Sequence, residues 1–323
     1  MANHISNVAI VGAGGNSGRW MTEALLKTGK HTVTAITRLD SQSTLPDGVT
    51  TRKVDYERPE TLVEALRGQD ALVITLSGRS QIQQIEEKLV RAAAKAGVPW
   101  ILPNEWSPDT ANEDIVKDVF ILKSKVATRN LVEELGKSSY ISIVTGFWYE
   151  WSLALPHGFG IDLINHRATF YDEGETKIST TTWPQIGRAV AVFLSLPVKA
   201  EGTNGEACLE HLTNKVVYIN SFTVSQKDML TSALRVTGTK ESDWTITKEP
   251  VRERYASGVQ EWKDGKYIGL AKILYTRVFY PDGCGDFEHN KGTLNSILGL
   301  PKEDTDEATK VALERAKIGN QWG

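Results

Sequence analysis

Short apolar runs rich in β-branched residues alternate with helical patterns through the first half of the chain. Six of these runs predict β-strands, at Val8–Val11, Thr32–Thr37, Thr50–Val54, Ala71–Thr75, Trp100–Leu102 and Tyr140–Val144. The segments between them predict helices at Gly18–Lys27, Pro59–Arg67, Gln81–Ala96 and Val116–Leu135. Gly29 stands just after the first helix, where a left-handed C-terminal cap is expected. Because strands joined by crossover helices pair in parallel, the pattern predicts an α/β fold with a doubly wound parallel sheet.

The hydrophobic pattern becomes irregular after Gly146, where "FWYEWSLALPHGFG" is crowded with aromatic residues. Regular patterns return in "TTTWPQIGRAVAVFLS", which predicts a loop and a helix, and in "KVVYINS", which predicts a strand. The tail "KEDTDEATKVALERAKIG" predicts a terminal helix with capping residues and early negative charge. We therefore predict a nucleotide-binding domain at residues 1–150 and a smaller, partly interleaved substrate-binding part at residues 151–323. A segment near residues 178–225 is expected to return to the first domain.

A glycine-rich loop follows the first predicted strand, in "VAIVGAGGNSGRW". Gly12 suits a sharp exit from the strand, the middle glycines suit close approach of the backbone to a pyrophosphate, and Gly18 suits packing of the helix on the strand. A tight turn that binds nothing is the alternative, but a strand, a glycine loop and a helix in one βαβ unit favour a dinucleotide site of the Rossmann type. The residues predicted to bind the dinucleotide here are Gly12, Gly14, Gly15, Asn16, Ser17 and Gly18.

Arg38 stands at the end of the second predicted strand, where an NAD-binding unit usually places an acidic residue for the ribose hydroxyls. A guanidinium at this position suits the 2′-phosphate of NADPH, through two parallel hydrogen bonds and a full charge. The alternative is a solvated arginine, with Asp40 turned back toward the ribose. The sequence therefore predicts NADPH or NADP⁺ as the cofactor.

Two further strand ends are predicted to contact the cofactor. Asp55 follows the third strand and is expected near the adenine, whereas the end of the fourth strand is expected near the ribose and nicotinamide. The residues at that end are Thr75, Leu76 and Ser77. Aspartate is also a common turn former, so a purely structural role for Asp55 is the alternative.

Composition and charge exclude several classes of protein. The formal net charge of −3 gives no basic balance for binding nucleic acid or an anionic membrane. Two cysteines cannot build a disulfide framework, and the start of the chain lacks the pattern of a signal peptide. The longest apolar stretch, Ala189–Val198, has about half the length needed to span a bilayer. We therefore expect a cytoplasmic protein, monomeric or homodimeric, with no nucleic-acid or membrane partner.

The usual catalytic pair of short-chain dehydrogenases, a tyrosine followed four residues later by a lysine, occurs at none of the nine tyrosines. HExxH, GxSxG and clustered Cys/His motifs are also absent from the sequence, so no metal site is predicted. The remaining candidates are Lys123 and Lys125 in "ILKSKVATRNLVEELG", at the start of a predicted helix.

At this point the chain resembles the NmrA-like and isoflavone reductase-like branch of atypical short-chain dehydrogenases/reductases, with a tail like that of its fungal members. The resemblance extends over nearly the whole chain, and the glycine loop and the lysine segment are its specific parts. The features that carry it are "GAGGNSG", Arg38, the loop "WILPNEWSPD", the segment "KVATRNLVE" and the tail "LGLPKEDTDEAT".

The resemblance implies roles for single residues. It places Lys125 at the position of the family's catalytic lysine, a general acid or base beside the nicotinamide that also contacts the cofactor, with Arg129 and Glu133 on the same helix. A free lysine is too basic for this role, and burial beside other positive charge, such as that of Lys123, would lower its pKa. A solvated helix lysine is the alternative. The chain departs from the family pattern at Asn130 and in the loop "NEW", where the family has "SEF".

Aromatic residues after the sixth predicted strand are expected to form the substrate wall, because ligands of open α/β sheets bind beyond the strand ends. Core packing is the commoner fate of a single aromatic residue, so only one or two are expected to face the pocket. The predicted substrate residues are Trp106, Phe147, Trp148, Tyr149 and Trp151. For His157 and His166 a structural role is favoured over a proton relay, and Cys284 lies in a glycine-rich loop with no base to activate its thiol.

Together these features predict an NADPH-dependent reductase that transfers hydride to a conjugated, aromatic small molecule such as an enone, ketone or quinone methide, with Lys125 managing the proton. Two alternatives stay open. The first is a non-catalytic sensor of NAD(P) that regulates a protein partner, as some NmrA-like proteins do. The second is a redox-neutral isomerase on the same site.

Overall fold

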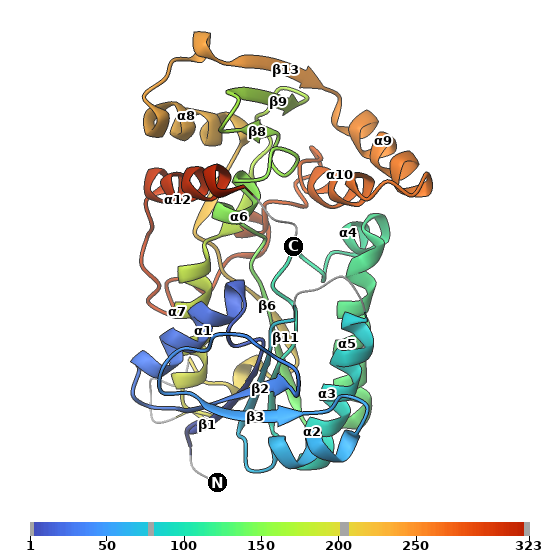
Figure 1. Ribbon diagram of the computed structural model, residues 1–323, viewed down its shortest axis with the longest axis vertical. Coiled ribbons are helices and arrows are strands. Elements are labelled where there is room, and N and C mark those ends of the chain that lie inside the picture. Colours follow the sequence, from blue (N-terminus) through green and yellow to red (C-terminus); the bar gives the residue numbers. More distant parts are fainter. Residues whose placement is uncertain (1–2, 77–80, 201–206, 320–323) are drawn as a thin grey trace.

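A seven-stranded parallel sheet forms the centre of the larger part of the molecule (Figure 1). The computed structural model describes residues 3–76, 81–200 and 207–319. The strands follow the order β11-β6-β5-β4-β1-β2-β3, so the chain reverses its direction of winding between β1 and β4. Their bounds are Asn7–Val11 for β1, Thr32–Arg38 for β2, Thr50–Val54 for β3, Ala71–Ile74 for β4, Trp100–Leu102 for β5, Ser139–Val144 for β6 and Lys215–Tyr218 for β11. The predicted doubly wound α/β fold is confirmed, and ligands of such sheets bind at this reversal point.

A smaller part lies beyond the carboxyl ends of these strands, at the top of Figure 1. It contains two three-stranded sheets, ordered β12-β10-β7 and β13-β9-β8. Their strands are β7 (Phe147–Trp148), β8 (Ile161–Asp162), β9 (Arg167–Tyr171), β10 (Ile178–Thr181), β12 (Phe222–Val224) and β13 (Thr245–Glu249). The helices here are α6 (Tyr149–Leu153), α8 (Gln226–Thr237), α9 (Val251–Lys263), α10 (Ile268–Arg277), α11 (Phe287–Lys291) and α12 (Thr305–Ile318), with a 3₁₀ turn at Glu241–Asp243. A further 3₁₀ turn at Glu210–Leu212 packs on the core of the larger part.

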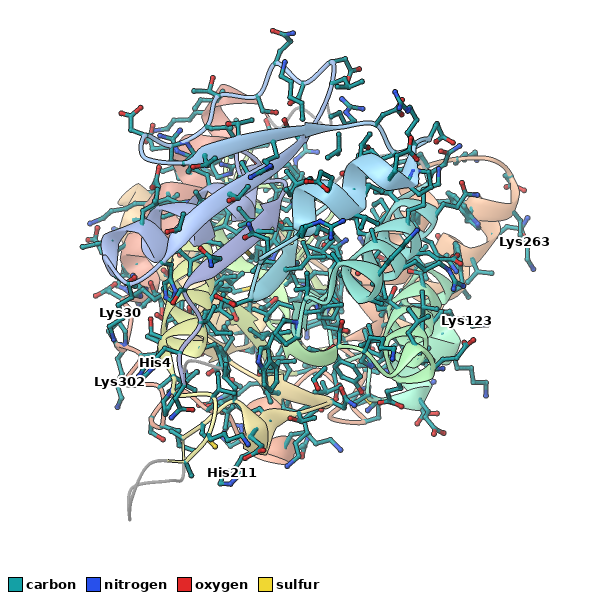
Figure 2. All side chains as sticks on the ribbon, turned by 90° about the horizontal axis from the view of Figure 1, so that it is seen from below. His4, Lys30, Lys123, His211, Lys263 and Lys302 are labelled. Carbon is teal, nitrogen blue, oxygen red and sulfur yellow. The ribbon has the colours of Figure 1, made fainter. Side chains whose placement is uncertain are left out.

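Several lysines lie on the outside of the molecule, as Figure 2 shows for Lys30, Lys263 and Lys302. Over the residues that the structure describes, no helix combines the length and the apolar character that a bilayer crossing requires. The polar residues of the amphipathic helices therefore face water, and their apolar residues form the cores between layers.

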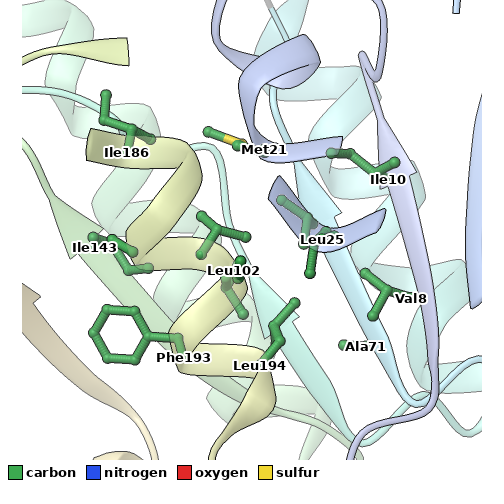
Figure 3. Packing of buried hydrophobic residues seen from close by; sticks show 14 of the residues in the cluster. Val8, Ile10, Met21, Leu25, Ala71, Leu102, Ile143, Ile186, Phe193 and Leu194 are labelled. Carbon is green, nitrogen blue, oxygen red and sulfur yellow. The ribbon is translucent and has the colours of Figure 1, made fainter. Parts of the chain in front are cut away.

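The two faces of the sheet are packed by different helices. Alternate residues of β1 point to opposite faces, so Val8 and Ile10 join one core whereas Ala9 and Val11 join the other. The first core includes α1 (Asn16–Lys27) and α7 (Trp183–Ser195), as Figure 3 shows. The helices that cover the second face are α2 (Pro59–Leu66), α3 (Ile82–Ala96) and α5 (Lys123–Leu135). Both faces are thus buried, as the continuous apolar strands require.

The prediction of a single helix at Val116–Leu135 is wrong. The chain forms α4 (Glu113–Asp118), a 3₁₀ turn η1 (Phe120–Leu122) and then α5. The helix breaks at Val119, where the backbone has φ −109° and ψ 81°. Tertiary contact is the reason, because Val119 and Leu122 turn inward to a buried cluster with Ile273 of α10. The break places Lys125 in the first turn of a helix and exposes Phe120 at its start.

Two elements from the second half of the sequence lie in the larger part. The helix α7 packs against α1, and β11 pairs in parallel with β6, with Lys215 opposite Ile141. Both elements fall within the segment that the sequence predicts to return to the first domain. The sheet is therefore completed only after the chain has built β7, β8, β9 and β10 of the smaller part.

Candidate active site

A cleft of about 640 Å³ opens at the carboxyl ends of β1 and β4, where the winding of the sheet reverses. It brings together the glycine loop, the ends of β4 and β5, the first turn of α5 and residues of the smaller part. The described lining residues are Gly15, Asn16, Ser17, Thr75, Leu76, Gln81, Ile82, Gln83, Glu86, Asn104, Trp106, Phe120, Ile121, Leu122, Lys123, Ser124, Lys125, Trp148, Trp262, Tyr267 and Leu270.

Steric contacts in the glycine loop explain why the sequence has glycine there. Gly12 has φ +86°, and a Cβ at this position would lie 2.0 Å from the carbonyl oxygen of Thr75. A Cβ on Gly18 would lie 2.0 Å from the carbonyl oxygen of Gly12. Gly14 is required for a different reason from the one predicted, since its Cβ would lie 2.5 Å from the carbonyl oxygen of Thr44 in the loop after β2. The glycines therefore bring three backbone segments into close contact at the edge of the cleft.

The N-terminus of α1 is suited to bind an anion. Its N-cap is Gly15, no side chain caps the helix, and its first turn holds no acidic residue. By contrast, α7 and α8 are capped by the side chains of Thr182 and Ser225. Because uncapped N–H groups and the helix dipole both favour negative charge, this end of the cleft fits the phosphates of a dinucleotide.

Arg38 lies at the end of β2 with 65% of its side chain exposed, and its Nε is 3.3 Å from Asp40. This ion pair between exposed groups contributes little stability, so the guanidinium can take another anion at low cost. Asp55 does not line the cleft. Its carboxylate accepts the N–H of Glu57 at 2.9 Å within a turn, which gives it a structural role, and its contact with adenine stays a prediction. Ser77 lies outside the described residues.

The loop after β5 is tied to the end of β4 by two side chains. The Asn104 amide accepts the N–H of Leu76 at 3.2 Å and donates to its carbonyl at 3.1 Å. Trp106 is buried and donates its indole N–H to Ile74 at 2.8 Å. The asparagine at this position, where the family has serine, has a separate donor and acceptor that pair at once with the backbone N–H and C=O of Leu76.

Lys125 lies at the floor of the cleft and donates a hydrogen bond from Nζ to the backbone carbonyl of Asn104. Burial lowers the pKa of Lys125 below its ordinary value, while the carboxylates of Glu105 and Glu86 oppose this change. The positive charge that also lowers this pKa belongs to Arg129, so the contribution expected from Lys123 is corrected. Lys123 is exposed and lies at the periphery (Figure 2).

A buried ion pair supports the segment that carries Lys125. Arg129 donates to Glu105 at 2.9 Å and to the hydroxyl and carbonyl oxygens of Thr110 at 2.6 and 3.1 Å. On the same helix, Glu133 accepts the hydroxyl of Tyr140 at 3.0 Å, whereas Asn130 is exposed. Arg129 and Glu133 are therefore structural: Arg129 fixes α5 against the loop that Lys125 contacts, and Glu133 ties α5 to β6.

Of the aromatic residues predicted as the substrate wall, Trp106 and Trp148 line the cleft and the others do not. Phe147 stacks on Tyr275 at 4.2 Å between ring centroids. Tyr149 is fully buried and shares a hydrogen bond of 2.9 Å with Thr309 of α12. The pairing of β7 with β10 directs these residues into the core of the smaller part, so their assignment to the cleft is wrong.

Trp151 also lies away from the cleft. It packs against Trp183 of α7 at 5.8 Å between ring centroids, and the Arg315 guanidinium lies 5.1 Å above its ring. These contacts join the cores of the two parts of the molecule, which corrects the prediction that Trp151 meets substrate.

The smaller part provides an aromatic side of the cleft that the sequence does not predict. Trp262 at the end of α9 lies 5.7 Å from Phe120 of η1, ring centroid to centroid, and Tyr267 and Leu270 follow at α10. No local motif marks these residues, which are more than 100 positions from the glycine loop. The segment "EWKDGKYIGL" carries only one signal, two large aromatic residues flanking a helix end.

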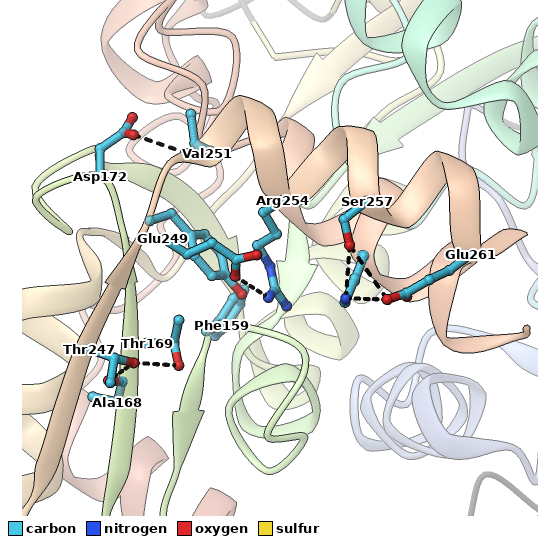
Figure 4. Close-up of polar contacts among 12 residues, drawn as sticks. Phe159, Ala168, Thr169, Asp172, Thr247, Glu249, Val251, Arg254, Ser257 and Glu261 are labelled. Carbon is cyan, nitrogen blue, oxygen red and sulfur yellow. Dashed lines mark hydrogen bonds and ion pairs between the residues drawn. The ribbon is translucent and has the colours of Figure 1, made fainter.

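Polar contacts anchor α9 to the smaller part (Figure 4). The backbone N–H of Val251 donates to Asp172 at 3.0 Å, and the buried Arg254 pairs with Glu249 at 2.9 Å. Near the other end of α9, Glu261 pairs with Lys272 of α10 at 2.5 Å. Trp262 is therefore presented by an anchored helical pair and not by a free loop.

The remaining candidates of the sequence lie outside the cleft. His166 stacks on Trp244 at 5.0 Å, and the exposed His157 borders a separate apolar cavity. Burial raises the pKa of the Cys284 thiol, which makes it a weaker nucleophile at neutral pH. Throughout the described part of the chain, no group of three His, Cys, Asp or Glu side chains could hold a metal ion.

Comparison with known proteins now defines the class. The model of the NmrA-like family matches residues 4–214. Oxidoreductase aprR of Aspergillus flavus is 30% identical over 304 residues, covering 93% of this chain and 96% of that protein. The chain therefore belongs to the NmrA-like family, as the resemblance predicted, and the prediction that it is an oxidoreductase is confirmed.

Solved structures share the fold. A chain from the crystal structures of pinoresinol-lariciresinol and phenylcoumaran benzylic ether reductases has a TM-score of 0.74 at 17% identity, covering 94% of this chain and 98% of its own. The NADPH-dependent quinone oxidoreductase QOR2 of Escherichia coli, complexed with NADPH, has a TM-score of 0.66 at 20% identity, covering 93% and 98%. These likenesses show a common architecture with the isoflavone reductase type over nearly the whole chain.

Proposed function

We propose that the protein is an NADPH-dependent reductase of conjugated, aromatic small molecules, with Lys125 as the general acid or base. One observation carries the proposal. The ammonium of Lys125 lies in the same cleft as the uncapped N-terminus of α1, so a cofactor-binding end and a proton-bearing group face one volume.

The residues of the cleft fit the cofactor. The first turn of α1 and the glycine loop would hold the pyrophosphate, and the exposed guanidinium of Arg38 would pair with the 2′-phosphate. Thr75 and Leu76 at the end of β4 would border the nicotinamide half. NADPH supplies a hydride when it is bound. The related fold of the E. coli quinone oxidoreductase, solved with NADPH, supports the same choice.

Lys125 would deliver the proton that accompanies reduction. Its ammonium donates to the Asn104 carbonyl in the floor of the cleft, and rotation of the side chain would bring Nζ to a carbonyl oxygen of the substrate. Lys125 would pass its proton to the substrate oxygen, and its amine would then be reprotonated from solvent. Burial lowers the pKa of Lys125 toward the range in which such a transfer is efficient.

The aromatic side chains of the cleft favour a flat substrate. Trp106 and Trp148 come from the larger part and β7, whereas Trp262 and Tyr267 come from α9 and the start of α10. Aromatic rings on opposite sides of a cleft bind planar conjugated molecules by stacking and by burial of apolar surface.

The direct experiment is a screen of quinones, enones and aromatic ketones with NADPH, followed by absorbance at the nicotinamide band. Consumption of NADPH with at least one acceptor supports the reductase. Binding of NADPH without turnover, together with a co-purifying protein partner, would favour the sensor. Conversion of a substrate with no net loss of NADPH would favour the isomerase.

Replacing Arg38 with alanine is expected to weaken NADPH binding by about 10- to 100-fold, because charge-assisted bonds to the 2′-phosphate are lost. Binding of NADH should change little. Arg58→Ala is the matched control, since Arg58 is equally exposed and pairs with Glu60 at 2.9 Å. Fluorescence titration with both cofactors gives the result, and equal losses for NADPH and NADH would refute the assignment.

Gly12→Ala is expected to abolish NADPH binding, since its methyl group would overlap the Thr75 carbonyl and displace the glycine loop. Gly29→Ala is the control at the other end of α1. Gly29 also has a positive φ, +64°, but no atom lies within 4 Å of its absent Cβ, so only a backbone cost of about 1 kcal/mol is expected. Thermal-shift assays with and without NADPH separate the two, and an NADPH response retained in a folded Gly12→Ala protein would contradict the prediction.

A further inference from the structure

A buried carboxylate in the cleft has no part in the mechanism above. Glu86 projects from α3 with only 2% of its surface exposed, yet it belongs to the lining of the cleft. Carboxylates are almost never this buried without a partner, because removal of the charge from water is costly. Its neighbour Glu87 faces outward instead and pairs with Arg91 at 2.9 Å.

Glu86 and Lys125 bind opposite sides of the same residue. The Oε1 atom of Glu86 accepts the backbone N–H of Asn104 at 2.7 Å, and Lys125 donates from Nζ to the backbone carbonyl of Asn104. The side chain of Asn104 is itself paired with Leu76. Asn104 therefore joins three elements of the cleft, and it holds one acidic and one basic side chain at fixed positions.

The second carboxylate near Lys125 is already neutralised. Glu105 pairs with Arg129 at 2.9 Å and accepts the hydroxyl of Thr110. Glu86 has no guanidinium partner among the described residues, and its hydrogen-bond partners are neutral groups, the backbone N–H of Asn104 and the side chain of Thr128. Glu105 and Arg129 thus form an ion pair, whereas Glu86 and Lys125 are joined through the backbone of Asn104.

The other groups around the cleft add little to this balance. Among the described lining residues the charged side chains are Glu86, Lys123 and Lys125, and Lys123 is exposed to water. The side formed by α9 and α10 contributes Trp262, Tyr267 and Leu270, of which only Tyr267 can titrate. Among the described lining residues, Glu86 therefore carries the one carboxylate, while Glu105, which also raises the pKa of Lys125, is paired with Arg129.

We propose that Glu86 is a positioning residue that keeps Lys125 protonated and oriented as a proton donor. It acts through the backbone of Asn104, which both side chains contact. The inference rests on the proposed function, because it specifies the direction in which Lys125 moves its proton. Mutual electrostatic effects agree with the geometry: burial raises the pKa of Glu86, and the charge of Lys125 opposes the rise. After the proton passes to substrate, the amine is neutral and the carboxylate favours its reprotonation from solvent.

The test is Glu86→Gln, which retains an oxygen to accept the Asn104 N–H but removes the charge. We expect the pKa of Lys125 to fall, so that its amine reacts about tenfold faster with acetic anhydride on the acidic side of its titration. Trace labelling of the cofactor-free protein, followed by mass spectrometry, measures the reactivity of Lys125 as a function of pH. Lys123 provides an internal reference, and Glu87→Gln is the control for the loss of one negative charge on α3.

A second readout uses turnover. The fall of kcat/KM at high pH reports loss of the protonated donor. In Glu86→Gln this fall should begin at a lower pH, and the substitution should change kcat more than KM. Glu86→Asp, which keeps the charge, should restore the position of this limb in part. A folded Glu86→Gln protein in which neither the labelling pKa nor the pH limb moves would overturn the inference.

The two proposals can fail separately. If labelling of Lys125 shifts but no acceptor consumes NADPH, the Glu86–Lys125 coupling stands and the reductase is rejected. If NADPH is consumed but labelling does not shift, the reductase stands and the role of Glu86 is rejected. Should Glu86→Gln fail to fold, labelling of the wild-type protein decides, because a coupled pair titrates Lys125 in two steps and an isolated lysine in one.

Discussion

Replacing Lys125 with alanine is expected to lower kcat by about 10² to 10⁴-fold, the range that a positioned general acid contributes. The substitution removes the proton donor at the floor of the cleft, while the glycine loop and the N-terminus of α1 stay intact. NADPH binding should therefore remain measurable. Stopped-flow or steady-state oxidation of NADPH with an accepted substrate gives kcat, and fluorescence titration gives the cofactor affinity.

Lys123→Ala is the control, because this lysine has the same charge on the same turn but is exposed. It should leave kcat within about twofold, the range of ordinary surface substitutions. If Lys125→Ala retains full turnover, the proton comes from another source and the assignment of Lys125 fails. Equal losses in both variants would instead point to a general electrostatic effect of α5.

Arg129→Leu should be the most destabilising of the substitutions considered, by about 3–5 kcal/mol, because it leaves the buried carboxylate of Glu105 without its partner. The hydroxyl and carbonyl oxygens of Thr110 lose a donor as well. Urea unfolding followed by fluorescence and circular dichroism measures the change. Arg91→Leu removes an exposed ion pair of equal length and should cost less than about 0.5 kcal/mol.

A second variant distinguishes lost pairing from lost packing. Glu105→Leu combined with Arg129→Leu removes both charges, so it should recover much of the stability that the single change loses. If the double variant is no more stable than Arg129→Leu, then the packing of the arginine and its bonds to Thr110, and not the ion pair, stabilise this segment.

Much of the larger part could be predicted from the sequence, because its signals are local. The run Val8–Val11 is apolar on both faces and therefore reads as a buried parallel strand, and β1 does contribute residues to two cores. The glycines of the loop after it mark positions where a Cβ would clash with backbone. The break between α4 and α5 could not be predicted in this way, because the helical periodicity of Val116–Leu135 is continuous and contact with α10 interrupts the helix.

The candidate site divides in the same way. Lys125 could be distinguished from Lys123 by a motif register, and the structure places only Lys125 on the Asn104 carbonyl. The aromatic run after β6 could not be sorted, because the sides to which Phe147 and Trp148 point depend on the pairing of β7 with β10. Trp262 lies in no recognisable motif, since it reaches the cleft through the packing of α9 on α10.

The sequence by itself determined the parallel sheet and the glycine loop, and it marked Arg38 as the candidate for a 2′-phosphate and Lys125 as the candidate for proton transfer. Those features depend on sterics and chemistry within a few residues of each other. Only the tertiary structure decided which aromatic rings face the cleft, and it alone joined Glu86 to Lys125 through Asn104. Burial is the reason, because a side chain's charge and orientation are set by neighbours that lie far away along the chain.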